Sequence, residues 1–181
     1  MINWVIMMGL LLFPTSLMAK TINAEKSTIK WQGKGLFKTH SGNLVFKSAE
    51  GKFDDKGNLI SGIFVVDMRS MTVDPKSVAV GAKKLLDHLK SDDFFNVENY
   101  RTSTFVLEGV TGAKGKGQLS IKDLTHPAMV TLIQTPSGYD WHLVFDRTKW
   151  SIKYGSKKFF KQIGDRFIED RVTVRGTLIV E

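Results

Sequence analysis

The chain has 181 residues, a formal net charge of +8 from 26 Lys plus Arg against 18 Asp plus Glu, and no cysteine. This length predicts one domain, large enough to bury a core without disulfide or metal support. The lack of cysteine excludes a disulfide framework, thiolate-bound zinc, iron–sulfur clusters, a cysteine nucleophile and a bacterial lipoprotein anchor. The basic excess is compatible with nucleic acid, an anionic membrane or a phosphorylated ligand, because net charge governs non-specific attraction rather than fold.

Residues 1–19 carry no charged side chain, and they contain an apolar run from 4 to 13 followed by a polar break at 14–16. This pattern predicts a secretory signal peptide cleaved after Ala19, because the run is too short for a comfortable membrane span. An uncleaved membrane anchor is the alternative. Residues 20–181 would then be a single domain exported to the periplasm of a Gram-negative envelope. Export weakens the nucleic-acid interpretation of the charge, and we expect no nucleic-acid partner.

Alternation of apolar and polar side chains dominates residues 20–181. Ile29 and Trp31 face one way and Lys30 the other, and the same period of two runs through 171–180. A period of two is typical of a half-buried strand. Short turns separate several such stretches. We predict eight strands, at residues 28–37, 42–48, 59–68, 103–110, 116–122, 128–134, 139–147 and 171–180.

Two segments break the alternation. Residues 76–91 place Leu85 and Leu89 four apart, which predicts a modest amphipathic helix between the third and fourth strands. Residues 151–170 form an irregular stretch before the last strand. The fold class is therefore all-β, an antiparallel sandwich or an eight-stranded barrel. A barrel of this size is either filled by its own side chains or holds one small ligand, and composition does not choose between the two.

The sequence offers no constellation for catalysis or metal binding. Its four histidines, at 40, 88, 126 and 142, have none of the short spacings typical of a metal site, and no nucleophile elbow is present. Asp92 and Asp93 are adjacent, so they do not face each other, and capping a turn is their expected role. We therefore predict a non-enzymatic protein with no catalytic residue, no metal and no cofactor.

Several short motifs follow one another in order along the chain. The most specific block is residues 88–97, which reads His-Leu-Lys-Ser-Asp-Asp-Phe-Phe-Asn-Val. The others are residues 27–34 with His40-Ser41-Gly42, residues 64–70, Thr104-Phe105, residues 117–121 with Thr125-His126-Pro127, residues 146–156, and Ile168-Glu169-Asp170. Together these motifs resemble the YceI-like, polyisoprenoid-binding family of exported bacterial proteins.

This resemblance implies a lipocalin-like antiparallel barrel with a helix at its side or end. It also implies an elongated apolar tunnel that binds a long-chain amphiphile such as a polyisoprenoid lipid, and it suggests a homodimer. Inward-facing aromatic residues suit both a tunnel and an ordinary core, and the resemblance favours the tunnel. The expected tunnel residues are Trp31, Phe46, Phe64, Leu85, Leu89, Phe105, Leu107, Trp141 and Phe145.

A basic cluster follows the seventh strand, and no acidic residue interrupts residues 147–164. We hypothesise that part of it, with lysines of the predicted helix, lies at the tunnel mouth and attracts a phosphate head group or an anionic membrane. A solvated face is the alternative. The head-group candidates are Lys84, Lys90, Arg147, Lys153 and Lys157; Lys83, Lys149, Lys158 and Lys161 belong to the same basic set.

The sequence therefore predicts an exported carrier that sequesters a long-chain lipid. One alternative is an accessory protein that handles an isoprenoid quinone in envelope electron transport. The other is an interaction module whose barrel is filled and binds no ligand.

Overall fold

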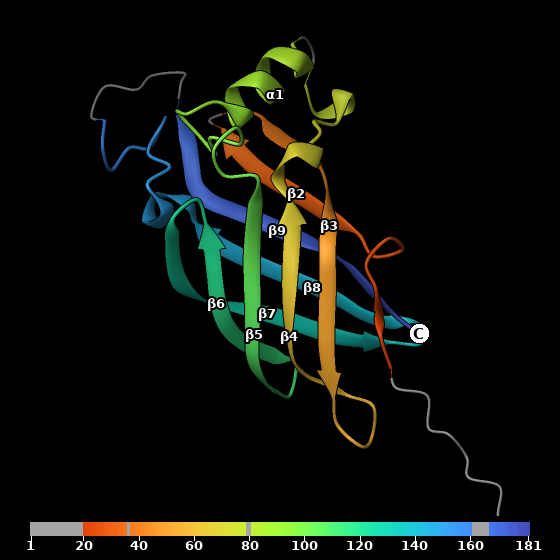
Figure 1. Ribbon diagram of the computed structural model, residues 1–181. Helices are drawn as coiled ribbons and strands as arrows, with labels where there is room; N and C mark the ends of the chain where they lie inside the picture. The colour runs from red at the N-terminus through yellow and green to blue at the C-terminus, as the bar shows by residue number, and fades with distance from the viewer. Residues whose placement is uncertain (1–19, 36, 79–80, 161–166) are drawn as a thin grey trace, which may run out of the picture.

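The computed structural model describes residues 20–35, 37–78, 81–160 and 167–181, and within them nine strands form one antiparallel sheet (Figure 1). The strands are β1 (Ile22–Asn23), β2 (Ile29–Gly35), β3 (Thr39–Phe53), β4 (Leu59–Asp67), β5 (Thr102–Thr111), β6 (Lys114–Ile121), β7 (Leu124–Thr135), β8 (Gly138–Asp146) and β9 (Ile168–Val180). The predicted signal peptide at residues 1–19 lies outside the described residues.

The sheet closes on itself because β9 pairs with both β2 and β8. From β2 to β8 each strand pairs with the next one in the chain, so eight strands make the barrel and β1 is added at the edge of β9. In Figure 1, β4, β5 and β6 cross the front of the barrel while β7, β8 and β9 cross the back. The predicted eight-stranded antiparallel barrel is confirmed.

Alternating burial along the strands explains why this sequence closes a barrel. In β6, Lys114 and Lys116 are exposed, whereas Gly115, Leu119 and Ile121 are buried. One face of the strand therefore meets water and the other the interior, as a period of two requires.

Several strand boundaries differ from the sequence-based ones. β3 continues to Phe53 rather than ending at 48, and Ala49 is buried in the added part. β7 begins at Leu124 rather than 128. Its first residues, which include Pro127, pair only with β6, and its pairing with β8 starts at Val130. Proline fits a strand where no neighbour needs its missing N–H. The short β1 was not expected.

The start of β9 also corrects the predicted irregular segment. Residues 168–170 belong to the strand, and Ile168 pairs with Gly35 of β2. The irregular stretch is therefore shorter than 151–170.

The helix α1 (Ala82–Lys90) is shorter than the predicted 76–91. Pro75–Ser77 forms a separate 3-10 turn, and Gly81 precedes the helix with a φ of +92°, a left-handed conformation that interrupts helical geometry. α1 covers one end of the barrel, which we call the α1 end (Figure 1). Among the described residues, no helix has the length and apolar character needed to cross a membrane.

Candidate binding site

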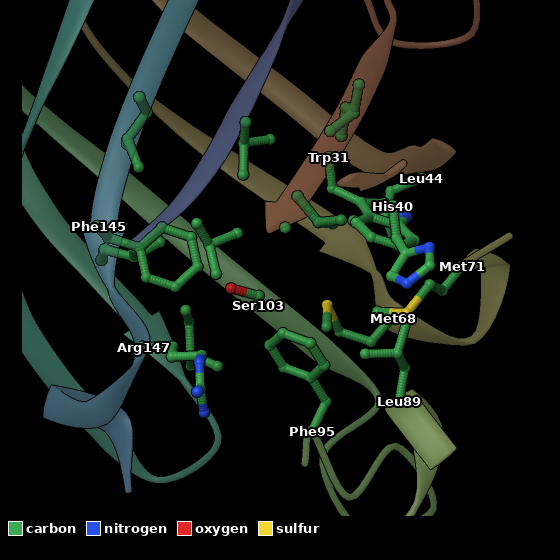
Figure 2. Close-up of a pocket in the computed structure, with 18 of the residues that line it drawn as sticks. Trp31, His40, Leu44, Met68, Met71, Leu89, Phe95, Ser103, Phe145 and Arg147 are labelled. Carbon is green, nitrogen blue, oxygen red and sulfur yellow. The ribbon is translucent and has the colours of Figure 1, made fainter. Parts of the chain in front are cut away.

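The barrel encloses a cavity of about 620 Å³ whose wall includes side chains from all eight barrel strands and from α1 (Figure 2). This volume lies in the range of small-molecule binding sites, roughly 300–1,000 Å³. The barrel is therefore not filled by its own side chains.

All nine apolar residues expected in a tunnel lie in the cavity wall. They are Trp31, Phe46, Phe64, Leu85, Leu89, Phe105, Leu107, Trp141 and Phe145. Period-two patterning places the strand residues there, and the i, i+4 spacing of Leu85 and Leu89 directs α1 onto the barrel. Their contact with a ligand stays a prediction.

An aromatic group lies within the wall. The ring of Phe46 is 6.3 Å from the ring of Phe64 and 6.3 Å from that of Trp141, centroid to centroid. Tilted pairs at this separation are favourable for aromatic rings. The three side chains come from β3, β4 and β8, so they link different parts of the wall.

Polar groups of the wall gather at the α1 end. Ser103 is the second residue of β5, Glu169 is the second residue of β9, and Arg147 directly follows β8. In this antiparallel barrel these positions share one end. His40 lies at the same end, across the cavity from Arg147 (Figure 2). The opposite end of the wall is apolar and includes Ile29, Leu107, Leu132 and Leu178. The cavity is thus amphipathic along its length.

Arg147 is completely buried, and its guanidinium is engaged with the backbone. Nη1 donates to the carbonyl of Ile152 at 2.7 Å, Nη2 to that of Ile168 at 3.0 Å, and Nε to that of Glu169 at 3.1 Å. Asp170 lies 3.6 Å from Nη2. Burial lowers the pKa of Arg147 from its ordinary value, and the nearby carboxylates of Asp170 and Asp146 act in the opposite direction. Arg147 therefore ties the segment between β8 and β9 to the barrel.

The other four head-group candidates are outside the cavity wall. Lys90 Nζ donates to the carbonyl of Arg69 at 2.8 Å, and Lys84 is exposed on α1. Lys153 Nζ lies 4.9 Å from the ring centroid of Phe159, and Lys157 Nζ lies 4.4 Å from that of Phe167. The expected set therefore does not converge inside the cavity.

The remaining lysines of the basic set divide among other surroundings. Lys158 Nζ lies 2.6 Å from Asp146 and 3.4 Å from Asp170, and Lys83 pairs with Asp87 at 2.7 Å along α1. Lys149 is exposed. Lys161 lies outside the described residues.

Several wall residues were not expected from the sequence. Lys34, near the end of β2, and Lys38, just before β3, line the cavity. Met68 and Met71 come from the turn after β4, and Phe95 follows α1 (Figure 2). Lys38, Met71 and Phe95 lie outside the strands and helices, where no periodicity predicts a direction. Lys34 lies in β2, where the period of two predicts the face opposite Trp31, but the register of β2 shifts between Gly33 and Gly35. The signal in the sequence was that Lys34 and Lys38 flank Phe37.

The histidines have structural surroundings. His40 Nδ1 is 3.0 Å from the carbonyl of Ser77, and His126 Nε2 is 3.0 Å from that of Lys149. His88 packs its ring edge-on to Tyr154 at 4.4 Å between centroids. His142 is exposed on β8. Within the part of the chain that the structure describes, no three His, Asp or Glu side chains gather as a metal site.

Solved structures share this fold. BcnA of Burkholderia cenocepacia is similar with a TM-score of 0.63 and 23% identity, over 88% of this chain and 99% of that chain. A polyisoprenoid binding domain from Saccharophagus degradans, implicated in plant cell wall breakdown, has a TM-score of 0.58 and 14% identity, over 90% of this chain and 98% of that chain. At these identities the likeness concerns the fold.

Sequence comparison extends the likeness. A UPF0312 protein of Staphylococcus aureus (strain MRSA252) is 30% identical over 87 residues, which are 46% of this chain and 51% of that protein. The match thus spans about half the length of this curated relative. The model of the YceI-like domain family matches residues 21–179, which is nearly the whole described chain. The chain belongs to the YceI-like domain family.

Proposed function

We propose that the protein is an exported, non-enzymatic carrier that sequesters a long-chain amphipathic lipid of the polyisoprenoid type. The observation that carries this proposal is the polarity of the cavity, which is apolar at one end and polar at the α1 end. An amphipathic chain matches this distribution when its tail lies toward Leu132 and Leu178 and its head near Ser103. The polyisoprenoid binding domain from Saccharophagus degradans has the same fold, which supports this ligand class.

Burial alone supplies the binding energy. Each CH₂ group transferred from water to an apolar wall contributes about 0.8 kcal/mol, so a long chain binds without a charged partner. Arg147 and His40 already engage backbone carbonyls, which supports a binding role over a catalytic one. The open volume of about 620 Å³ argues against the filled-barrel alternative.

The proposal includes export through residues 1–19 to the periplasm, on the basis of their uncharged apolar pattern. A homodimer stays a prediction, which sedimentation velocity of the exported protein tests. An isoprenoid quinone has the same kind of tail with a different head, so it belongs in the ligand panel.

The test starts from protein purified after export from its own cells. Extraction with organic solvent and mass spectrometry should find a long-chain isoprenoid in a near-stoichiometric amount. The extracted protein should take up added polyprenyl alcohol, polyprenyl diphosphate or quinone. A protein that carries no lipid and takes up none of the three is not a carrier of this class.

Two substitutions on the same strand provide a matched control. Val174 lines the cavity, whereas its neighbour Thr173 is outside the wall set on β9. Val174→Trp should lower isoprenoid affinity at least tenfold by occupying the space of the tail, and Thr173→Trp should leave it unchanged. Urea midpoints of both variants show whether the barrel stays folded.

A further inference from the structure

Three exposed phenylalanines lie near the polar end of the cavity. Phe37 lines the cavity and is nevertheless 82% exposed, so its ring stands at the opening between the interior and the solvent. Phe159 and Phe160 are 47% and 51% exposed. Single exposed apolar side chains are ordinary, but a group of rings around an opening indicates an interaction surface.

Backbone pairing brings the two phenylalanine-bearing segments to one end of the barrel. Gly35, just before the turn with Phe37, pairs with Ile168 at the start of β9. The N–H of Ile168 donates to the carbonyl of Gly155 at 2.8 Å, a few residues before Phe159. Both segments therefore flank the start of β9, and Figure 1 shows this region at the α1 end.

Lysines are interleaved with these rings. Lys34 and Lys38 lie on either side of Phe37 in the chain, are exposed, and line the cavity. Lys153 stands over Phe159, and Lys157 over Phe167, which itself lines the cavity. We call these four lysines, with Phe37, Phe159 and Phe160, the mouth surface.

Nearby acidic groups leave this surface basic. Asp146 and Asp170 both lie beside Lys158, at 2.6 Å and 3.4 Å from its Nζ. Asp170 also faces Arg147 at 3.6 Å. Glu169 is the one carboxylate among the described residues that line the cavity. The four lysines of the mouth surface are thus arranged to face an anionic partner.

We propose that the mouth surface docks on an anionic lipid bilayer and that the ligand passes directly between the bilayer and the cavity. This inference rests on the proposed carrier function. Aromatic and aliphatic side chains at the interface enter the acyl boundary, while lysine stems extend their ammonium groups to the head groups. A polyisoprenoid has a high cost of transfer through water, and a mouth held against the bilayer removes that step.

An anionic bilayer fits the surface better than an acidic protein does. An acidic protein would satisfy the lysines, but the ring of Phe37 forms part of the cavity opening as well as the outer surface. When the ring of Phe37 enters the partner, the apolar interior of the partner becomes continuous with the apolar cavity of the barrel. A bilayer has such an interior, and it is where a lipid ligand resides.

Vesicle co-sedimentation of the protein purified after export tests the docking. We expect at least tenfold tighter binding to phosphatidylcholine vesicles containing about 30% phosphatidylglycerol than to phosphatidylcholine alone, with loss at high salt. Intact-mass measurement shows whether residues 1–19 remain on the protein. Equal binding to both vesicle types would overturn the proposal.

Matched variants assign the effect to the mouth surface. Phe159→Ser with Phe160→Ser, at two positions 47% and 51% exposed that do not line the cavity, should weaken binding to anionic vesicles about tenfold or more. Met129→Ser with Ile133→Ser removes side chains of similar exposure, 54% and 60%, from the outer face of β7 and should change nothing. Equal losses in the two double variants would contradict the assignment. If the parent protein is a dimer without vesicles and the mouth variant is a monomer, the partner of the mouth surface is a second copy of the chain and not a bilayer.

Farnesol supplied from solution separates this proposal from the carrier function. The mouth variant should bind dissolved farnesol like the parent protein but take up a polyprenyl alcohol from anionic vesicles at least tenfold more slowly. If the mouth variant binds farnesol and takes up the polyprenyl alcohol from vesicles as fast as the parent, the docking proposal is wrong and the carrier function stands. Vesicle binding by a protein that takes up neither ligand overturns both direct transfer and the carrier function.

Discussion

Trp31 on β2 lies directly opposite Gly42 on β3, and its indole Nε1 donates to the carbonyl of Thr72 at 3.0 Å. A Cβ atom at residue 42 would collide with that carbonyl and come within 2.7 Å of the indole nitrogen. Trp141 likewise lies opposite Gly176 between β8 and β9, where a Cβ atom would collide with the carbonyl of Thr28, but the buried Nε1 of Trp141 has no hydrogen-bond partner among the described residues. Each tryptophan of the cavity wall thus faces a glycine whose missing side chain leaves room for a backbone carbonyl, that of Thr72 or that of Thr28.

Gly42→Ala should lower the free energy of unfolding by about 2–3 kcal/mol, because the added methyl group displaces Thr72 and breaks the bond from Trp31. The urea midpoint measures this loss. Gly33→Ala on the neighbouring strand is the control, because nothing lies within 4 Å of its added Cβ. An equal change in both variants would mean that loss of glycine flexibility, and not the collision, sets the effect.

Arg147→Met should destabilise the protein by about 3–5 kcal/mol, because it leaves three backbone carbonyls without their donor. Lys149→Met, at an exposed position nearby, should change stability by less than about 0.5 kcal/mol. Chemical unfolding and lipid titration of the variant together distinguish a structural role of Arg147 from a role in head-group recognition. A stable Arg147→Met protein with selectively lost diphosphate binding would instead assign Arg147 to head-group recognition.

Tryptophan fluorescence should report the occupied cavity. Trp31 and Trp141 line the wall, whereas Trp150 is buried outside it with its Nε1 bonded to the carbonyl of Leu119 at 3.1 Å. A brominated long-chain lipid should therefore quench a Trp150→Phe variant strongly and a Trp31→Phe, Trp141→Phe variant weakly, because bromine quenches on contact. The reverse order would show that the chain binds elsewhere.

Stability should fall in acid through Asp146 and Asp67. Burial raises the pKa of Asp146, but hydrogen bonds from Lys158 and Thr148 together hold it below its ordinary value. The side chain of Arg69 holds the pKa of Asp67 below its ordinary value. A carboxylate whose folded pKa lies below the unfolded value of about 4 stabilises the fold above about pH 5. That contribution is lost as pH falls through the folded pKa.

Urea midpoints between pH 7 and pH 3 measure this acid dependence. Asp146→Asn keeps an acceptor for Thr148 but removes the charge beside Lys158, so its midpoint should fall less between pH 5 and pH 3 than that of the parent. Because the side chains of Asp146 and Lys158 are both partly exposed, we expect the free energies of unfolding of parent and variant to differ in their acid dependence by less than about 1 kcal/mol. Asp123→Asn at an exposed turn is the control. A parent midpoint that stays constant to pH 3 would rule out the mechanism.

The strands could be predicted because a barrel wall imposes one rule on every strand, an inward side chain at each second residue. Trp141 and Phe145 follow that rule on β8, and both reach the cavity wall. The rule does not mark where a strand ends. The added part of β3 keeps the alternation, with Ala49 buried and Glu50 and Lys52 exposed, but its length is specified by pairing with β4.

The polar end of the site was less accessible to sequence reasoning. Lys153 and Lys157 appeared as a basic run, but their directions depend on a segment without periodicity. Arg147 was expected at the tunnel mouth as a head-group candidate. Three carbonyls brought together only by the closure of β8 and β9 engage it instead. Long-range convergence of this kind leaves no local pattern in the chain.

Closure of the barrel by β9 sets an order of events. β2 and β8 are both available before residues 168–180 emerge, yet the cavity has no complete wall until β9 pairs with both of them. The earliest and latest barrel strands must therefore meet before any lipid can be retained. In the proposed carrier, a chain that lacks residues 168–180 would hold no ligand, because its cavity wall would be open between β2 and β8.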